Sequence, residues 1–193
     1  IPQVGCVTGD IRETDKVRAA RRGCDAALHA AAVASLDPRK AQETYDNNVL
    51  GMKAVMGSAC ELGLRSIVYV SSLSVLFRPD APRIDESTPL ADCHEPYSRS
   101  KRDSDAYVRE LQAQGHPIQI SYPTAVVGPD DPKFNESNYA ISEFVSGRLP
   151  LTTSGFQLVD GRDLAQAHRW MLEHPRSANH EQGRYIIGGH YLP

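Results

Sequence analysis

Two residues that together could move a proton, Tyr97 and Lys101, stand four positions apart in the chain. On a helix this spacing places both side chains on one face. A free phenol titrates near pH ~10, and a nearby ammonium favours the phenolate and lowers that pKa toward neutral. The pair could therefore exchange a proton during the interconversion of a hydroxyl and a carbonyl. The alternative is an exposed tyrosine beside a solvated lysine, since one such pair can arise by chance.

Two serines directly follow a strand that the sequence predicts. The run 66–70 is nearly continuously apolar, as expected for a buried parallel strand, and Ser71 and Ser72 come directly after it. A serine hydroxyl near Tyr97 could hold a substrate carbonyl by a hydrogen bond while the phenol transfers the proton. Either serine could instead simply cap a turn at the end of the strand.

Helical and extended patterns alternate along the chain, which predicts an α/β fold with a parallel sheet. We expect helices over 15–22, 44–62, 96–114, 140–147 and 160–172, and strands over 4–7, 24–32, 66–72, 118–122, 126–127 and 185–189. The segment 129–156 is predicted to be a long loop around the fourth helix. Because ligands of such sheets bind beyond the carboxyl ends of the strands, Ser72 and Tyr97 should meet in one crevice there.

Composition limits the class of protein. A chain of 193 residues suits one domain, and a net charge of −3 gives no basic surface for nucleic acid. No apolar run approaches the ~18 residues of a membrane span. The four cysteines lack the spacing of a metal site and are interpreted as reduced thiols. We therefore expect a cytoplasmic protein that binds a small molecule, without a metal, a membrane or a nucleic acid.

The order of these motifs resembles the extended short-chain dehydrogenase/reductases, including the NAD-dependent epimerase/dehydratase group. The similar segments cover nearly the whole chain, and they are 9–11, 29–32, 45–51, 70–72, 97–101, 123–129 and 160–168. The resemblance implies a Rossmann-like, doubly wound parallel sheet and a dinucleotide cofactor, NAD or NADP.

The resemblance also implies a role for each matching residue. Ser72, Tyr97 and Lys101 would form a catalytic triad, with Ser74 as the second choice for the serine, and Lys101 would also hold the nicotinamide ribose. The implied cofactor contacts are Asp10 and Ile11 at the adenine, Ala30, Ala31 and Ala32 along the adenosine ribose and pyrophosphate, Asn47 beside a structural Asn48, and Pro123 and Val126 near the carboxamide.

One departure from the family pattern is large. The first strand of the family and its Gly-x-x-Gly-x-x-Gly turn, which cradles the pyrophosphate, have no counterpart in the sequence. We therefore expect residues 1–193 to form a partial dinucleotide-binding domain without the first two strands and most of the substrate domain, with 129–156 as an insertion on the substrate side. The strand at 4–7 would then either pair with other residues or be displaced. In the second case the sheet reduces to strands near 26–30, 67–71, 118–122 and 185–187.

The expected substrate and assembly rest on the same resemblance. The sequences after Ser72 and around Pro123 are similar to those of dihydroflavonol reductases and 3β-hydroxysteroid dehydrogenases, which favours a hydrophobic carbonyl compound. A nucleotide-sugar epimerase is the alternative enzyme, and a non-catalytic dinucleotide-binding regulator is the alternative from another class. Related proteins pair through two helices, so we expect a homodimer through 47–62 and 97–113. Its apolar contacts would come from Met52, Met56, Ala106 and Val108.

Overall fold

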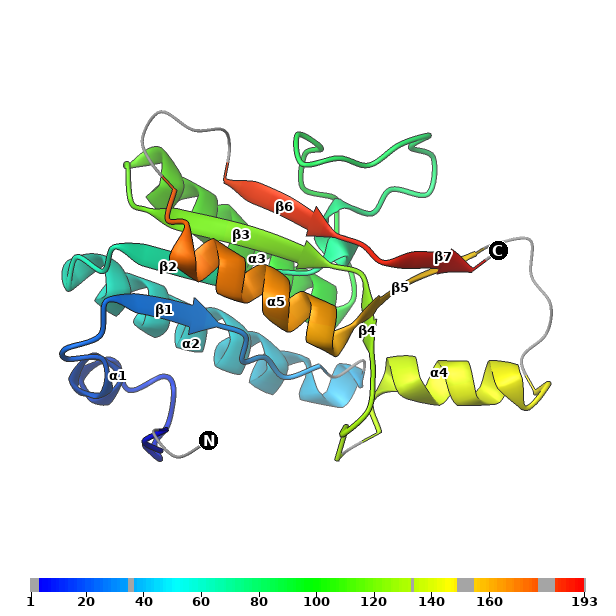
Figure 1. The fold of residues 1–193 in the computed structure, drawn as a ribbon, viewed down its shortest axis with the longest axis horizontal. Helices are drawn as coiled ribbons and strands as arrows, with labels where there is room; N and C mark the ends of the chain where they lie inside the picture. The colour runs from blue at the N-terminus through cyan, green and yellow to red at the C-terminus, as the bar shows by residue number, and fades with distance from the viewer. Residues whose placement is uncertain (1–3, 35–36, 133, 149–154, 177–182, 193) are drawn as a thin grey trace.

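A computed structural model describes residues 4–34, 37–132, 134–148, 155–176 and 183–192 (Figure 1). Its centre is a four-stranded parallel sheet in the order β1-β2-β3-β6. These strands are β1 (Ala26–His29), β2 (Ser66–Val70), β3 (Ile118–Pro123) and β6 (Arg184–Ile187). Every residue of β3 is buried, as expected for a central strand covered on both sides. The predicted α/β fold with a parallel sheet is confirmed.

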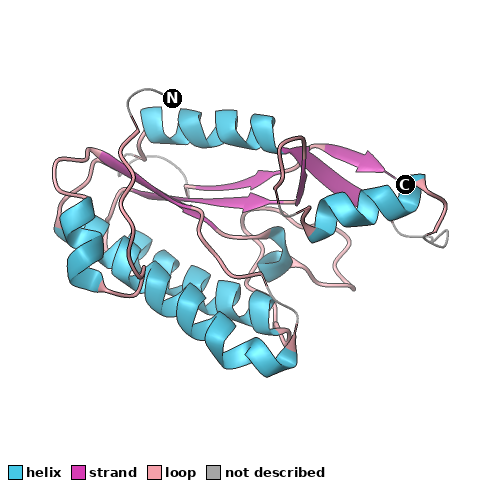
Figure 2. Ribbon diagram, turned by 90° about the horizontal axis from the view of Figure 1, so that it is seen from below, coloured by secondary structure: helices cyan, strands magenta, loops and turns pink. Residues whose placement is uncertain are grey.

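Helices cover both faces of this sheet (Figure 2). On one side lie α2 (Ala41–Glu61) and α3 (Pro96–Ala113), and on the other lies α5 (Gly161–Glu173). The short helix α1 (Thr14–Ala20) packs beside α2. Proline suits the first turn of a helix because that position needs no amide donor, so Pro96 fixes the start of α3. All four helices lie close to the ranges that the sequence predicts.

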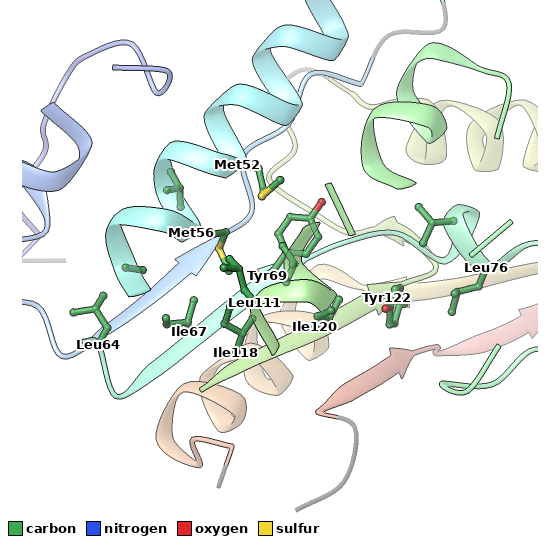
Figure 3. Packing of buried hydrophobic residues seen from close by; sticks show 14 residues of the cluster. Met52, Met56, Leu64, Ile67, Tyr69, Leu76, Leu111, Ile118, Ile120 and Tyr122 are labelled. Atoms are coloured by element: carbon green, nitrogen blue, oxygen red, sulfur yellow. The ribbon is translucent and has the colours of Figure 1, made fainter. Parts of the chain in front are cut away.

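The main core lies between the sheet and the pair α2 and α3. Met52 and Met56 point from α2 toward Ile67, Tyr69 and Ile118 of the sheet (Figure 3). Their spacing of four residues gives α2 one continuous apolar face. This packing corrects part of the expected dimer contact, because Met52, Met56 and Val108 are at most 1% exposed within one chain. Side chains that fill the core of the chain are not available to a second copy.

A second, smaller sheet extends from the first. It has the order β4-β5-β7 and consists of β4 (Ala125–Val127), β5 (Phe156–Asp160) and β7 (His190–Leu192). The sequence predicts only β4, so β5 and β7 are corrections. Helix α4 (Glu136–Val145) packs on β4 and begins earlier than the predicted 140–147. Its start is explained by Asn135, whose side chain accepts hydrogen bonds from the amides of Ser137 and Asn138. Residues 149–154 of the predicted loop lie outside the described residues.

The predicted strand at 4–7 is wrong. Val4 to Val7 are exposed and form no strand. The parallel sheet consists of four strands near 26–30, 67–71, 118–122 and 185–187, as expected if the segment 4–7 is displaced. An extended segment needs partners for its backbone amides and carbonyls, and no neighbouring strand offers them here. The chain instead runs along the outside of α2, where Ile11 lies tightly over Gly51.

Within the described residues, no helix is long and apolar enough to cross a membrane. The same part of the chain holds no cluster of three histidine, cysteine or acidic side chains that could bind a metal ion. The four cysteines are free thiols.

Candidate active site

A cavity of about 350 Å³ lies at the carboxyl ends of β1, β2 and β3. Ser72, Tyr97 and Lys101 line it together, although they come from two different elements. Four of the residues expected at a cofactor also line it, and they are Ala30, Ala32, Pro123 and Val126. The crevice predicted beyond the strand ends is therefore present, and it contains the Tyr97–Lys101 pair.

Tyr97 lies in the first turn of α3 with its phenol largely buried. Burial raises the pKa of Tyr97, and a hydrogen bond from Ser72 opposes this shift. This result differs from the expectation that Lys101 lowers the pKa of the phenol. The reason is that burial penalises the phenolate, while the Lys101 ammonium is directed to a different oxygen. Tyr97 therefore keeps its proton at neutral pH and is suited to donate it.

Lys101 lies one turn further along α3 and is only 4% exposed. Its ammonium donates a hydrogen bond to the Val70 carbonyl at 2.8 Å and lies 5.3 Å from the centre of the Tyr69 ring. Burial lowers the pKa of Lys101 to about 8, and the negative charge of Asp105 opposes that shift. The side chain thus brings a positive charge to the base of the cavity and ties α3 to the end of β2.

The two serines after β2 have different surroundings. Ser71 is buried and donates to the Asp105 carboxylate at 2.6 Å, away from Tyr97. Ser72 precedes a short 3₁₀ helix, η2 (Leu73–Leu76), and its oxygen accepts from the amide of Ser74 at 3.2 Å and the hydroxyl of Ser74 at 3.0 Å. Ser72 therefore caps a turn, and its own proton remains available for Tyr97 or a ligand. The interpretation of Ser72 as a turn cap is thus confirmed, and its role in holding a substrate carbonyl stays a prediction.

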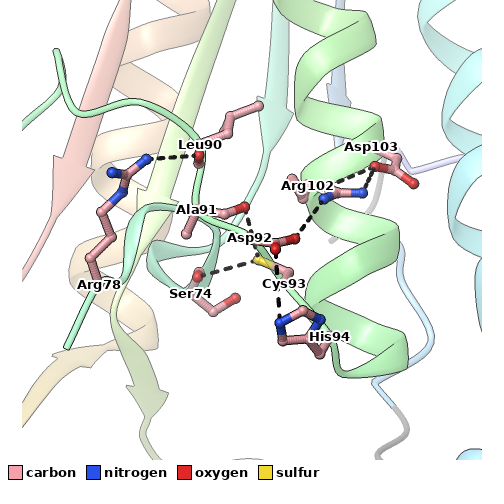
Figure 4. Close-up of polar contacts among 9 residues, drawn as sticks. All are labelled: Ser74, Arg78, Leu90, Ala91, Asp92, Cys93, His94, Arg102 and Asp103. Atoms are coloured by element: carbon pink, nitrogen blue, oxygen red, sulfur yellow. Dashed lines mark hydrogen bonds and ion pairs between the residues drawn. The ribbon is translucent and has the colours of Figure 1, made fainter.

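The segment between Ser72 and Tyr97 folds back on η2 and α3 (Figure 4). The amide of Ala91 donates to the Val75 carbonyl at 2.7 Å. Arg102 of α3 pairs with Asp92 at 3.4 Å, and the thiol of Cys93 faces the Ser74 carbonyl. These contacts hold both ends of a long connection, so the hydroxyl and the phenol remain side by side.

The remaining predicted cofactor residues do not line this cavity. Asp10 pairs with Arg12 at 2.6 Å, and hydrogen bonds from Arg12 lower the pKa of its carboxyl to about 2. Ile11 packs over α2, Ala31 is exposed in the segment after β1, and Asn47 is half-buried on α2. The cavity therefore joins residues expected at the nicotinamide end with Ala30 and Ala32, which were expected along the adenosine ribose and pyrophosphate. Asp10 and Ile11, expected at the adenine, do not line it.

Asn48 has the structural role expected of it. Its amide group donates to the Val33 carbonyl at 3.0 Å and to the Ser100 hydroxyl at 2.8 Å, and its oxygen accepts from the Val33 amide at 2.7 Å. One side chain on α2 thereby fixes the segment after β1 and the first turns of α3. Ala30 and Ala32 lie in the first of these, and Tyr97 in the second.

Sequence reasoning placed Pro123 and Val126 at this wall of the cavity but missed the part of the wall that α5 provides. Thr124 is 9% exposed, and its hydroxyl oxygen has no hydrogen-bond partner among the described residues. His168 lies 2.9 Å from the Ser121 hydroxyl, and burial lowers the pKa of its ring, so the imidazole is neutral. The helical pattern after Asp160 placed α5 correctly, but nothing in it indicated that this helix reaches the strand ends.

Comparisons with known proteins agree with this geometry. The family model described as the NAD dependent epimerase/dehydratase family matches residues 2–188. A putative dihydroflavonol 4-reductase of Synechocystis sp. is 30% identical over 186 residues, which cover 94% of this chain and 54% of the relative. Cinnamoyl-CoA reductase 1 of Arabidopsis thaliana is 27% identical over 191 residues, covering 92% of this chain and 53% of the relative. The chain thus spans about half the length of the curated relatives that it matches.

Solved structures show the same fold. The dTDP-glucose 4,6-dehydratase DesIV of Streptomyces venezuelae, solved with NAD bound, superimposes with a TM-score of 0.81 at 25% identity. The match covers 100% of this chain and 61% of that structure. The chain therefore has a parallel sheet of the Rossmann type with helices on both faces.

Proposed function

The chain belongs to the NAD-dependent epimerase/dehydratase family of extended short-chain dehydrogenase/reductases, and we propose that its protein interconverts a hydroxyl and a carbonyl with NAD or NADP. The observation that carries the proposal is the meeting of Ser72, Tyr97 and Lys101 at one cavity. A phenol that burial keeps protonated suits the direction of reduction. In that direction Tyr97 donates its proton to the carbonyl oxygen while Ser72 holds this oxygen by a hydrogen bond.

The residues present fit the nicotinamide half of the cofactor. The cavity of about 350 Å³ is at the small end of the usual range for ligand pockets, so it suits part of a dinucleotide. The buried, unpartnered hydroxyl of Thr124 can pair with an amide, and Lys101 can pair with ribose hydroxyls. NADH would supply the hydride. Val126, Pro123 and the two alanines after β1 would exclude water from the reacting carbon.

The apolar lining favours a hydrophobic substrate. Lys101 supplies the one charged side chain among the residues that line the cavity in the described part of the chain, and Leu164, Ala165 and Val126 add apolar surface. The names of the reductase relatives agree with this choice. We propose an aromatic or alicyclic aldehyde or ketone as the substrate class.

The alternative enzyme is a nucleotide-sugar epimerase. A UDP-glucose 4-epimerase of Neisseria meningitidis is 31% identical over 108 residues, or 54% of this chain. Epimerisation returns the hydride to the same substrate, so it consumes no NADH. A regulator that binds dinucleotide without turnover is the third candidate.

One experiment separates the three candidates. The protein is titrated with NADH and NADPH by calorimetry and is then given a panel of hydrophobic carbonyl compounds and, separately, UDP-glucose. Oxidation of NADH or NADPH by a carbonyl compound supports the proposal. Conversion of UDP-glucose to UDP-galactose without net oxidation would replace it with the epimerase. Tight cofactor binding with no conversion of either class would indicate the regulator.

We also propose that the protein is a cytoplasmic homodimer and that 129–156 borders the substrate. The four free thiols suit a reducing compartment. With three of the expected contact residues in the core, the dimer contact would use the outer faces of α2 and α3. Leu50 is 48% exposed there, and Lys53 lies over the ring of Tyr107 at 5.2 Å.

A further inference from the structure

Behind the candidate active site lies a buried carboxylate that the proposed reaction does not use. Asp105 follows Lys101 by one turn of α3, and Arg109 follows Asp105 by another, so Tyr97, Lys101, Asp105 and Arg109 form one stripe. The Asp105 side chain is 0% exposed. A buried carboxylate is costly unless its charge is paired and hydrogen-bonded, so the contacts that keep it there indicate what it does.

Three elements contribute donors to Asp105. One oxygen accepts from the Ser71 hydroxyl at 2.6 Å. The other accepts from Arg109 at 2.7 Å and from the Tyr122 hydroxyl at 3.2 Å, and Arg109 also donates to Tyr122 at 2.9 Å. The carboxylate therefore joins the end of β2, the middle of α3 and the end of β3, which are the elements whose ends form the cavity.

The contact with Ser71 reaches the site through one peptide bond. Ser71 precedes Ser72, and its amide is fixed to β3 by a hydrogen bond to the Ser121 carbonyl at 2.8 Å. One residue earlier, the Val70 carbonyl accepts from Lys101 at 2.8 Å. Two consecutive residues, the last one of β2 and the one directly after it, are thus held from α3, one by Lys101 and one by Asp105. This double attachment sets the position of Ser72 relative to Tyr97.

We propose that Asp105 is a positioning residue of this site: one buried carboxylate fixes the strand end that carries Ser72 and keeps the Lys101 side chain ionised beside Tyr97. The inference rests on the proposed function. It predicts two separable effects of Asp105, a mechanical one that passes through Ser71 and an electrostatic one that acts on Lys101.

The electrostatic effect depends on which neighbours of Lys101 are charged. Burial and the nearby Lys101 charge lower the pKa of His29 on β1 to about 3, so this imidazole is neutral in the working range. Burial raises the pKa of Tyr69 on β2 and of Tyr122 on β3, so both phenols are neutral as well. Asp105 opposes the effect of burial on Lys101, and its own charge also faces Arg109 and Arg184 of β6. Burial raises the pKa of Asp105 itself, and the hydrogen bond from Ser71 and the charge of Arg109 oppose that shift. Among the described groups near Lys101, Asp105 is the one that can supply a negative charge.

Four variants of the protein test the proposal, with kcat and NADH affinity measured across pH. Asp105→Asn should lower kcat about 10–100-fold, because a small misplacement at the reacting groups has that effect. It should also move the alkaline loss of activity and of NADH binding to lower pH by about one unit, since a lost opposite charge disfavours the ammonium. Ser71→Ala should lower kcat without moving the alkaline limb of the pH profile, which is the pH range where activity and NADH binding are lost. Asp105→Glu keeps the carboxylate, so its alkaline limb should lie at the wild-type pH. Asp103→Asn removes a charge from the same helix outside the cluster and should change neither quantity.

The outcomes are distinguishable. An Asp105→Asn protein with the wild-type pH limb overturns the inference, as does a Ser71→Ala protein with wild-type kcat. If Asp105→Asn does not fold, Ser71→Ala and Asp105→Glu decide alone, and a shifted limb in Asp105→Glu counts against the proposal. A wild-type protein that binds NADH but reduces no carbonyl refutes the proposed function, and the pH limb of NADH binding then decides the inference. Absence of NADH binding overturns both.

Discussion

Replacing Lys101 by methionine should stabilise the protein while it removes function. The pKa of Lys101 falls from 10.5 to about 8 on folding because the side chain is almost completely buried. A shift of this size corresponds to about 3 kcal/mol that opposes folding at pH 7. Methionine has a similar length and no charge to desolvate. Against this gain stands the hydrogen bond to the Val70 carbonyl, whose loss costs about 1–3 kcal/mol.

The net stabilisation at pH 7 is therefore about 0–2 kcal/mol. For a chain of this size it should raise Tm by up to about 8 °C. Because the folded pKa is depressed, the unfavourable term is fully present below about pH 8 and disappears as pH rises toward 10.5. At pH 10 only about 1 kcal/mol of it remains, so the variant should lose its advantage there.

Calorimetric unfolding at pH 7 and pH 10 measures both effects. Lys40→Met is the matched control, since Lys40 is exposed directly before α2, and it should change stability by less than about 0.5 kcal/mol at either pH. NADH affinity should fall in Lys101→Met and not in Lys40→Met. A Lys101→Met protein that is less stable at pH 7, with the same difference at pH 10, would show that the burial of the ammonium does not oppose folding.

Three further predictions concern other parts of the structure. Thr124→Val removes a buried hydroxyl that has no hydrogen-bond partner among the described residues, so it should stabilise the protein by up to about 1 kcal/mol. It should also weaken NADH binding several-fold. Unchanged NADH affinity in a calorimetric titration would show that Thr124 does not contact the cofactor. Asn48→Ala breaks three hydrogen bonds and should lower the free energy of unfolding by about 2–4 kcal/mol in denaturant titration, whereas a loss below about 1 kcal/mol would contradict its linking role. Sedimentation at micromolar concentration should show a dimer, and a monomer there would refute the proposed assembly.

The sequence was sufficient for the elements that carry their own pattern. The apolar face of α2 predicts a helix because one face of that helix is buried. The continuous apolar run of β2 predicts a parallel strand because both of its faces are buried. The short strands β5 and β7 carry no such pattern. His190–Leu192 is exposed throughout and becomes a strand only through its antiparallel pairing with β5. The run at 4–7 shows the opposite case, in which an apolar pattern has no strand to pair with.

The candidate site could be predicted in composition but not in its electrostatics. The spacing of Tyr97 and Lys101 places them on one face, and the serines after β2 are visible in the sequence. The extent to which each side chain is buried could not be read from the sequence. Burial raises the pKa of Tyr97, and Met52 and Val108 are buried in the core of the chain. Asp105 is likewise an ordinary helical aspartate in the sequence. Its importance depends on Ser71 and Tyr122, which reach it from two strands.

The most direct test of the proposed chemistry compares the wild-type protein with Tyr97→Phe in single-turnover oxidation of bound NADH by a carbonyl substrate. The phenyl ring keeps the packing of the aromatic ring and removes the hydroxyl group, and with it the proton that Tyr97 would donate. A lost general acid should slow the chemical step by about 10²–10⁴-fold, while NADH affinity and Tm stay close to those of the wild type. A Tyr97→Phe protein that oxidises NADH at nearly the wild-type rate would contradict the assignment of Tyr97 as the proton donor.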